Sequence, residues 1–351
     1  MFKHNFYSTL NFVNGKILVP NSLAKIKSEP SDFRVSERLG FDCLGEGEHI
    51  WLNVTKTKMH TISVAKEIAK LAEIAVKHIG FSGMKDHRAI TSQWFSVWLP
   101  GVKDSELPTW QMLNECNLQV NKVVRHNRKL KKGTHLANDF EIRLVDFSGD
   151  IGEFKSQINT LLTHGVPNYF GEQRFGFSGN NLNKAADWFE KGYKIKEQNT
   201  RSLLLSSARS WLFNVVLSKR LENKDWLTVY DNEPLNLSGS KSYFISENKM
   251  EDQQRIIDID VNTTGPLWGK GIDKTLLTSS LRTLEEQVLA EYPVFLEGLE
   301  QAGLSYGRRS LRFFPQNLVW NVNDDCITLK FSLSRGQFAT AFLRELVSAK
   351  T

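Results

Sequence analysis

The sequence predicts a protein of mixed α and β structure with two kinds of segment. Apolar residues recur at every second position in roughly the first 150 residues and again in the last forty or so, which is typical of half-buried strands. Between about 164 and 312, longer stretches have apolar residues at helical spacing. With 351 residues, 40% of them hydrophobic, the chain is long enough for two domains and a substantial core.

Short alternating runs predict the strands of the first part. In DFRVSERL, Phe33, Val35 and Leu39 fall on one side of a period-two pattern. The run 61–79 has helical spacing instead, with Thr61 as its expected N-cap and Gly80 as its expected end. Further strands are predicted at 49–54, 93–99 and 140–144, and a second helix at 151–161.

The remaining elements follow from the same patterns. Helical spacing predicts long helices at 203–221 and 284–302 and a closing helix at 338–347. Alternation predicts a pair of strands at 318–322 and 327–333. Asp324 and Asp325 lie between those strands, where a polar pair indicates a turn rather than a metal site.

The positive charge belongs to the two flanking parts. The chain has a net charge of +6, with 22 Lys/Arg against 17 Asp/Glu in 1–163 and 4 against 3 in 313–351, so the middle part is neutral. An excess of basic residues favours an anionic partner for the flanking parts and another role for the middle.

Composition and motifs exclude several classes of protein. Cys43, Cys116 and Cys326 form no CxxC pair, which argues against a disulfide framework or a thiolate zinc site. Phosphate-binding loops, dinucleotide fingerprints, HExxH and GxSxG motifs are all missing from the sequence. No apolar run has the length of a signal peptide or a membrane span. We therefore expect a soluble, cytoplasmic protein without a metal or other cofactor.

Two segments are candidates for chemistry. Residues 122–132 hold six Lys/Arg and no acid, as in a phosphate-binding patch or a solvated strand edge. Asn138 and Phe140 follow, two positions apart on one side of a strand, and suit either base recognition or a core Phe beside a capping Asn. In SGMKDHRAITSQW, Asp86 lies among cations that favour an ionised carboxylate, although a charged turn would look the same.

Several longer segments together resemble the TruD family of pseudouridine synthases. They are GFSGMKDHRAITSQWFSV (80–97), RHNRKLKKGTHLANDF (125–140), GVPNYFGEQRFG (165–176) and SARSWLFNVVLSKR (207–220). Shorter pieces at 30–41, 45–52, 264–269 and 336–345 follow the family's order, so the resemblance covers almost the whole chain.

The resemblance implies both a fold and a reaction. The fold is α+β, with a catalytic core and antiparallel sheet formed by 1–163 and 313–351, and a mostly helical family-specific insertion domain at 164–312. The reaction is the isomerisation of uridine 13 of tRNA to pseudouridine, which depends on an aspartate and needs no cofactor. The expected partner is tRNA, with a monomeric protein and no membrane or protein partner.

Site residues carry over position by position. Asp86 matches the family's catalytic aspartate and Lys27 a lysine that approaches it. Asn138 and Phe140 match residues that contact and stack on the uracil. Aromatic residues expected to line the pocket are Phe33 and Phe338, and basic residues expected to bind RNA are Lys85, Arg125, Arg128, Lys129, Lys131, Lys132 and Arg174.

Two other functions remain open. One is an RNA-binding protein or RNA chaperone that has this fold but no catalytic activity, which an activity assay distinguishes from the enzyme. The other is a metal-dependent nuclease, which would need clustered acids near the basic run and would lose activity in EDTA. Whether the aspartate acts as a nucleophile or as a base at C2′ is open as well.

Overall fold

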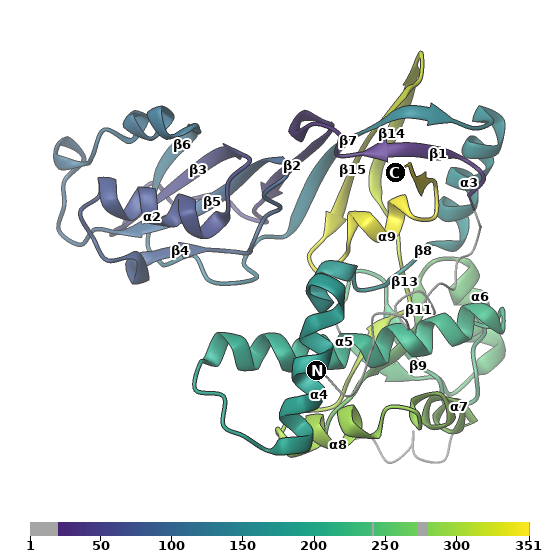
Figure 1. Cartoon of the computed structure of the whole chain (residues 1–351). Coiled ribbons are helices and arrows are strands. Elements are labelled where there is room, and N and C mark those ends of the chain that lie inside the picture. The colour runs from purple at the N-terminus through teal and green to yellow at the C-terminus, as the bar shows by residue number, and fades with distance from the viewer. Residues whose placement is uncertain (1–19, 241, 272–279, 351) are drawn as a thin grey trace. The chain divides into compact units, whose positions relative to one another are not determined.

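The computed structural model describes residues 20–240, 242–271 and 280–350, which form two compact units (Figure 1). We call Asn21–Phe154, Pro315–Gly336 and residues 347–350 the sheet unit. Lys155–Phe314 with Gln337–Leu346 is the helical unit. The sequence predicts a catalytic core at 1–163 and 313–351 and an insertion domain at 164–312. These functional assignments stay predictions.

Within its described residues, the sheet unit contains a ten-stranded sheet. Seven strands follow the order β14-β15-β7-β2-β5-β3-β6, while β1 pairs with β7 and β16, and β4 pairs with β5. The pairs are antiparallel except β2–β5 and β1–β16. The strands are β1 Leu23–Ile26, β2 Phe33–Arg38, β3 His49–Thr57, β4 Ile79–Phe81, β5 Ile90–Trp98, β6 Leu118–His126, β7 Ala137–Ser148, β14 Gln316–Asn323, β15 Cys326–Ser334 and β16 Ser348–Ala349.

The period-two runs are confirmed as strands, and their apolar sides bury the core of the sheet unit. Helix α2 (Thr61–Leu71) packs across β3 and β5 (Figure 1). Its Val64 and Ile68 are fully buried against residues such as Leu52 and Phe95. Burying aliphatic and aromatic side chains from both elements in one cluster holds the helix on the sheet.

The predicted helix 61–79 is too long at its C-terminal end. Helix α2 stops at Leu71, and Glu73 adopts the left-handed conformation, with φ of 54°. The amide of Glu73 donates to the Lys70 carbonyl and that of Ile74 to the Ala69 carbonyl, which is a Schellman cap without glycine. The apolar spacing continues past the cap because the next residues pack on the same core from other elements.

Gly80 is therefore not a helix end. It lies in β4, where a Cβ atom would collide with the Leu130 carbonyl oxygen and the Ser96 hydroxyl. The glycine lets the loop before β7 pass directly over β4. The turn at Asp324–Asp325 is confirmed, because Asn323 pairs with Cys326 across a two-residue connection between β14 and β15.

The helical unit contains most of the helices. Helix α3 begins at Ile151, before the unit's first residue, and α5 contains the predicted run 203–221. The elements are α3 Ile151–His164, α4 Asn180–Lys191, α5 Gln198–Glu222, α6 Lys249–Ile257, α7 Ser280–Leu289, α8 Pro293–Gln301 and α9 Ala339–Leu343, with strands β8 Val166–Pro167, β9 Pro234–Leu237, β10 Tyr243–Ile245, β11 Val261–Leu267, β12 Gly307–Ser310 and β13 Arg312–Phe313.

Two helix predictions in this unit are corrected. The single helix expected at 284–302 is two helices, α7 and α8, because Pro293 starts the second and disfavours helical angles at Tyr292. The closing helix expected at 338–347 is shorter, since only Ala339–Leu343 is helical. No helix in the described part of the chain is long and apolar enough to span a membrane.

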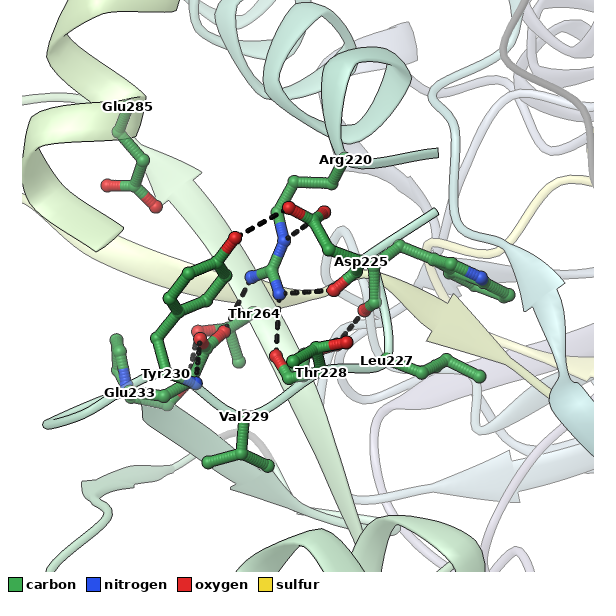
Figure 2. Close-up of polar contacts among 12 residues, drawn as sticks. Arg220, Asp225, Leu227, Thr228, Val229, Tyr230, Glu233, Thr264 and Glu285 are labelled. Carbon is green, nitrogen blue, oxygen red and sulfur yellow. Dashed lines mark hydrogen bonds and ion pairs between the residues drawn. The ribbon is translucent and has the colours of Figure 1, made fainter. Parts of the chain in front are cut away.

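A buried ionic cluster lies in the helical unit (Figure 2). The guanidinium group of Arg220, fully buried on α5, donates to a Glu233 carboxylate oxygen at 2.7 Å and an Asp225 carboxylate oxygen at 3.2 Å. It also donates to the carbonyl oxygens of Asp225 (2.6 Å) and Thr228 (2.7 Å). The Tyr230 hydroxyl donates to Asp225 at 2.6 Å. This cluster ties the end of α5 to the loop before β9.

Candidate active site

The register of β2 and β7 gathers the predicted base-contacting residues on one face of the sheet. Val35 pairs with Phe140 and Glu37 with Asn138 across the two strands. Directly paired residues point to the same face, and period two adds Phe33 to it. The structure therefore brings Phe33, Asn138 and Phe140 together, although more than a hundred residues separate the first from the other two.

Asp86 lies in the loop between β4 and β5, which the side chains of Thr61, Lys56 and Gln93 hold in position, the last by donating to the Gly83 carbonyl oxygen at 3.2 Å. The Thr61 hydroxyl accepts from the Lys85 amide at 3.0 Å and donates to the Gln93 side chain at 2.9 Å. The Lys56 ammonium group donates to the Asp86 carbonyl oxygen at 2.7 Å. His60 is the N-cap residue of α2, so the prediction of Thr61 as N-cap is wrong: its hydroxyl anchors the Asp86 loop instead.

The Asp86 carboxylate is about three-quarters buried and is held by donors on both oxygens. Lys27 donates to Oδ2, and the Arg88 amide donates to Oδ1 at 2.9 Å. Burial by itself would raise the pKa of Asp86, but the hydrogen bond and charge of Lys27, the Arg88 amide and the charge of His87 lower it below its ordinary value. The arrangement keeps an ionised carboxylate at neutral pH.

Lys27 approaches Asp86 from the end of another strand. It follows β1 with a left-handed backbone, φ of 63°, a conformation that costs energy for a residue other than glycine. Its ammonium group also lies 4.1 Å from the centre of the Phe33 ring, a cation–π contact. The Phe33 ring therefore lies beside the contact between Lys27 and Asp86.

Aromatic rings form a row next to this ion pair. Phe33 meets Phe140 edge to face, with ring centres 6.1 Å apart. Phe140 in turn stacks on Phe331 of β15, with ring centres 5.3 Å apart. Phe331 was not among the residues predicted to form the site, although the alternation at 327–333 places it on the same side of its strand as the apolar residues. Phe140, the partly exposed member of the row, offers an aromatic ring of the kind on which bases stack.

A polar network that the sequence did not indicate lies beside Asp86. The Lys85 ammonium group lies 3.0 Å from a carboxylate oxygen of the fully buried Glu37 and donates to Asn138 Oδ1 at 2.5 Å. Asn138 Nδ2 is 3.4 Å from His135 Nε2, and His135 Nδ1 is 2.5 Å from the Ser82 hydroxyl. The sequence did contain one sign of this network. Glu37 lies on the side of β2 where the alternation places apolar residues.

Burial and neighbouring charges shift several pKa values in this region. Burial, helped by the charges of Lys85 and Arg335, lowers the pKa of His135 to about 4, so the ring is neutral at physiological pH. Burial lowers the pKa of Lys56 to about 8, against the opposing charge of Asp86. Burial also raises the pKa of Glu37, and Lys85 limits that rise.

The basic run lies next to the Asp86 loop. The Gly133 amide donates to the Ser82 carbonyl oxygen at 2.7 Å, which ties residues 127–136, the basic loop, to the segment before Asp86. Arg128, Lys131 and Lys132 are exposed in this loop. Arg125 instead donates to Asp104, Gly47 and Val102, and Lys129 to the Lys77 carbonyl. Arg128, Lys131 and Lys132 therefore point into solvent from the basic loop, and Lys122 of the same run is exposed on β6.

Two predicted residues belong to the helical unit. Phe338 precedes α9, and its ring centre lies 6.0 Å from that of Phe170. Arg174 lies over the same Phe170 ring at 5.7 Å and donates to the Ser206 hydroxyl at 3.1 Å. Burial lowers the pKa of Arg174. The roles expected for Phe338 and Arg174 stay predictions.

Side chains that bind metals do not gather in the described residues. Across 20–240, 242–271 and 280–350, no three His, Cys, Asp or Glu side chains converge as a metal site would require. Cys43, Cys116 and Cys326 are free and partly buried. The chemistry that the described site can perform is that of a carboxylate, an ammonium group, an amide and an aromatic surface.

The fold matches that of a solved protein. A crystal structure from Methanosarcina mazei, of a protein assigned as tRNA pseudouridine synthase D, is similar with a TM-score of 0.67 over 95% of each chain. The sequences are 18% identical, so this likeness concerns the fold alone. The predicted α+β class is confirmed, and the chain has the fold of a pseudouridine synthase.

Sequence comparison narrows this class to one family. The family model for tRNA pseudouridine synthase D (TruD) matches residues 19–183 and 179–346. The tRNA pseudouridine synthase D of Nitrosococcus oceani is 41% identical, with 93% of this chain and 91% of the relative covered. That of Methylococcus capsulatus is 40% identical, with 92% and 90% covered. The chain belongs to the tRNA pseudouridine synthase D family.

Proposed function

We propose that this protein converts a uridine of tRNA, uridine 13, to pseudouridine, and that Asp86 is the catalytic residue. The observation that carries the proposal is the Asp86 carboxylate, kept ionised by Lys27 within one cluster that also includes Asn138 and the Phe140 ring. Family membership supports both the reaction and the tRNA substrate.

The reaction requires little beyond these groups. The N1–C1′ bond of the uridine breaks, the uracil turns, and a C5–C1′ bond forms, after which the C5 proton leaves and N1 carries a proton. The change is an isomerisation with no net oxidation. Asp86 acts as a carboxylate, either by attacking the ribose or by removing the C2′ proton, and both routes need its ionised form. A C2′-deuterated substrate separates the routes, because only proton removal gives a primary isotope effect.

The base must leave its stack to reach Asp86. Extruding a nucleotide costs a few kcal/mol. Stacking on the Phe140 ring, worth roughly 1 to 3 kcal/mol per base, offsets much of that cost. Asn138 then hydrogen bonds to the uracil edge, and Phe33 lines the pocket. No step in this scheme uses a cofactor.

The rest of the chain serves tRNA binding in this proposal. The exposed Arg128, Lys131 and Lys132 contact the phosphate backbone near the site. Residues 164–312 form the family-specific insertion domain, whose neutral charge suits a role in shape recognition. The protein works in the cytoplasm, where tRNA is modified, as a monomer.

The test is the Asp86→Asn variant with tRNA labelled with tritium at C5 of uridine. Pseudouridine formation releases the tritium, so the native protein should release it and the variant should not, while tRNA affinity stays within a few-fold. Asp146→Asn is the matched control, because Asp146 is an exposed partner of Lys25 on the same sheet and should stay active. An active Asp86→Asn protein would disprove the catalytic assignment.

Position 13 is tested in cells. Mapping pseudouridine in tRNA from a strain that lacks this protein should reveal loss at position 13 alone. Loss of pseudouridine at another position would support the reaction but show that the target is not uridine 13. The competing proposal, an RNA-binding protein without catalysis, predicts unchanged pseudouridine in that strain and no tritium release by the native protein.

A further inference from the structure

The orientation of the Asn138 amide is determined by its neighbours. Its Oδ1 atom accepts from the Lys85 ammonium group at 2.5 Å, and its Nδ2 atom lies 3.4 Å from His135 Nε2. An ammonium group can only donate, so the amide oxygen must face Lys85. Turning the amide over would place its NH₂ group against three N–H donors and lose that bond.

His135 reinforces the same orientation from the other side. Burial and nearby cations lower its pKa to about 4, so the ring carries one proton. With Nε2 accepting from Asn138, that proton is on Nδ1, which donates to the Ser82 hydroxyl at 2.5 Å. The Ser82 hydroxyl also accepts from the His135 amide at 2.9 Å, which keeps it in place as an acceptor. The ring thus offers Asn138 an acceptor.

The Glu37 carboxylate holds the Lys85 ammonium group in position. The Glu37 side chain is fully buried, and its Oε2 lies 3.0 Å from the Lys85 ammonium nitrogen. The Lys85 side chain is itself only 7% exposed. Removing two opposite charges from water is favourable only when each has the other close by, so the pair holds the lysine in one position. Asn138 therefore meets a fixed cation rather than a mobile surface lysine.

A fixed amide distinguishes the two pyrimidines. Each amide atom of the half-buried Asn138 has one further hydrogen-bonding position, a lone pair on Oδ1 and an N–H on Nδ2. Uracil presents N3–H beside a carbonyl oxygen, which complements this pair. Cytosine held in the same position, by stacking on Phe140 and with its ribose at Asp86, presents the N3 lone pair beside an amino group, which would set acceptor against acceptor and donor against donor.

We infer that Lys85 and His135, with Glu37 behind them, are positioning residues that hold Asn138 in the orientation that accepts uracil and rejects cytosine. The inference rests on the proposed function, in which Asn138 faces the target base. The inference adds that Lys85, His135 and Glu37, and not Asn138 alone, determine which base the site accepts. A bidentate contact of this kind discriminates between bases by roughly 10- to 100-fold.

The experiment measures the dissociation constants of two tRNAs that differ by uridine or cytidine at the target position. Both are measured in an Asp86→Asn background so that no turnover occurs. The parent should prefer the uridine tRNA by roughly 10- to 100-fold. Adding Lys85→Met should lower this ratio, because only the His135 contact, at 3.4 Å, then opposes turning the amide over. Lys131→Met, an equal loss of charge in the basic loop, should weaken both tRNAs and keep the ratio.

A second variant guards against misfolding. Lys85→Met leaves the buried Glu37 carboxylate without its cation, so Glu37→Gln with Lys85→Met, which removes both charges, is measured alongside and should lower the ratio in the same way. A ratio that stays at the parent value in either folded variant overturns the inference, as does a parent with no preference for uridine. Tritium release by the native protein is a separate measurement, so failure of the proposed function is recognised independently.

Discussion

The ammonium group of Lys27 donates a hydrogen bond to the Asp86 carboxylate, although 59 positions separate the two residues in the sequence. Lys27 follows β1, and Asp86 lies between β4 and β5. The neighbouring strands β1, β7, β2 and β5 connect these two places across the sheet. Both side chains are about three-quarters buried, so solvent and salt screen the pair only weakly. The proton affinity of Asp86 therefore depends on Lys27.

Replacing Lys27 by methionine should move the acid limb of the activity profile to higher pH. Burial raises the pKa of Asp86, and in the native protein Lys27 and the Arg88 amide more than compensate. Without the ammonium group less opposes the effect of burial, so the pKa of Asp86 rises. A carboxylate required in its ionised form then loses activity at a higher pH, which kcat/KM for pseudouridine formation against pH will measure.

The same variant should change stability with a defined sign. A carboxylate whose pKa is lowered by folding stabilises the fold above its unfolded pKa, and this contribution disappears as pH falls through the folded pKa. Lys27→Met should thus unfold more easily than the native protein at neutral pH and approach it in strong acid. The control is Lys25→Met on the same strand, whose exposed partner is Asp146. Identical acid limbs for Lys27→Met and the native protein would contradict the coupling.

Replacing Thr61 by valine should reduce kcat by roughly 10- to 100-fold, because displacing a catalytic group by about 1 Å has that effect. The hydroxyl holds the Lys85 amide and Gln93, which keep the Asp86 loop in place. Loss of these bonds should also lower the free energy of unfolding by about 1 to 3 kcal/mol, measured by urea denaturation. Thr61→Ser keeps the hydroxyl and should restore most of kcat. Full activity of Thr61→Val would remove Thr61 from the positioning of Asp86.

Reversing the charge of Lys131 and Lys132 together should weaken tRNA binding and reduce its salt dependence. Both lysines are exposed in the basic loop beside the Asp86 segment. The slope of log K against log salt should become shallower by about 1 for each phosphate that the protein no longer neutralises. The same reversal at Lys66 and Lys70, exposed on α2, serves as the control. An unchanged slope in the first variant would exclude the basic loop from the tRNA interface.

Removing the guanidinium group of Arg220 should strongly destabilise the helical unit. Arg220→Met leaves the fully buried Glu233 and the partly buried Asp225 without their cation, and breaking such a pair costs about 3 to 5 kcal/mol. The adjacent Lys219→Met is a close control, because its ion pair with Glu222 is exposed and such pairs contribute at most about 1 kcal/mol. Thermal unfolding of both variants tests the difference. Equal losses would mean that the cluster has no special role.

Helices and strands could be predicted wherever the spacing of apolar residues fitted only one kind of element. Alternation located β2, β3, β5, β7 and β15, because one face of each strand meets a core, and it also located β14, none of whose residues is fully buried. Helix ends were less predictable, since the apolar spacing near Ile74 continues although the backbone turns at Glu73. Pro293 was a visible signal for the division of 284–302, and its effect on Tyr292 explains the break.

The sequence by itself determined the family, the strands and the acid at position 86, since these depend on residue order and short-range spacing. Which side chains touch Asp86 was decided by the tertiary structure. Lys27 donates to its carboxylate, and Thr61 fixes its loop instead of capping a helix. The buried Glu37 and the neutral His135 became recognisable only through their contacts. The physical reason is that strand pairing and register, which are non-local, determine the neighbours that set each group's charge and orientation.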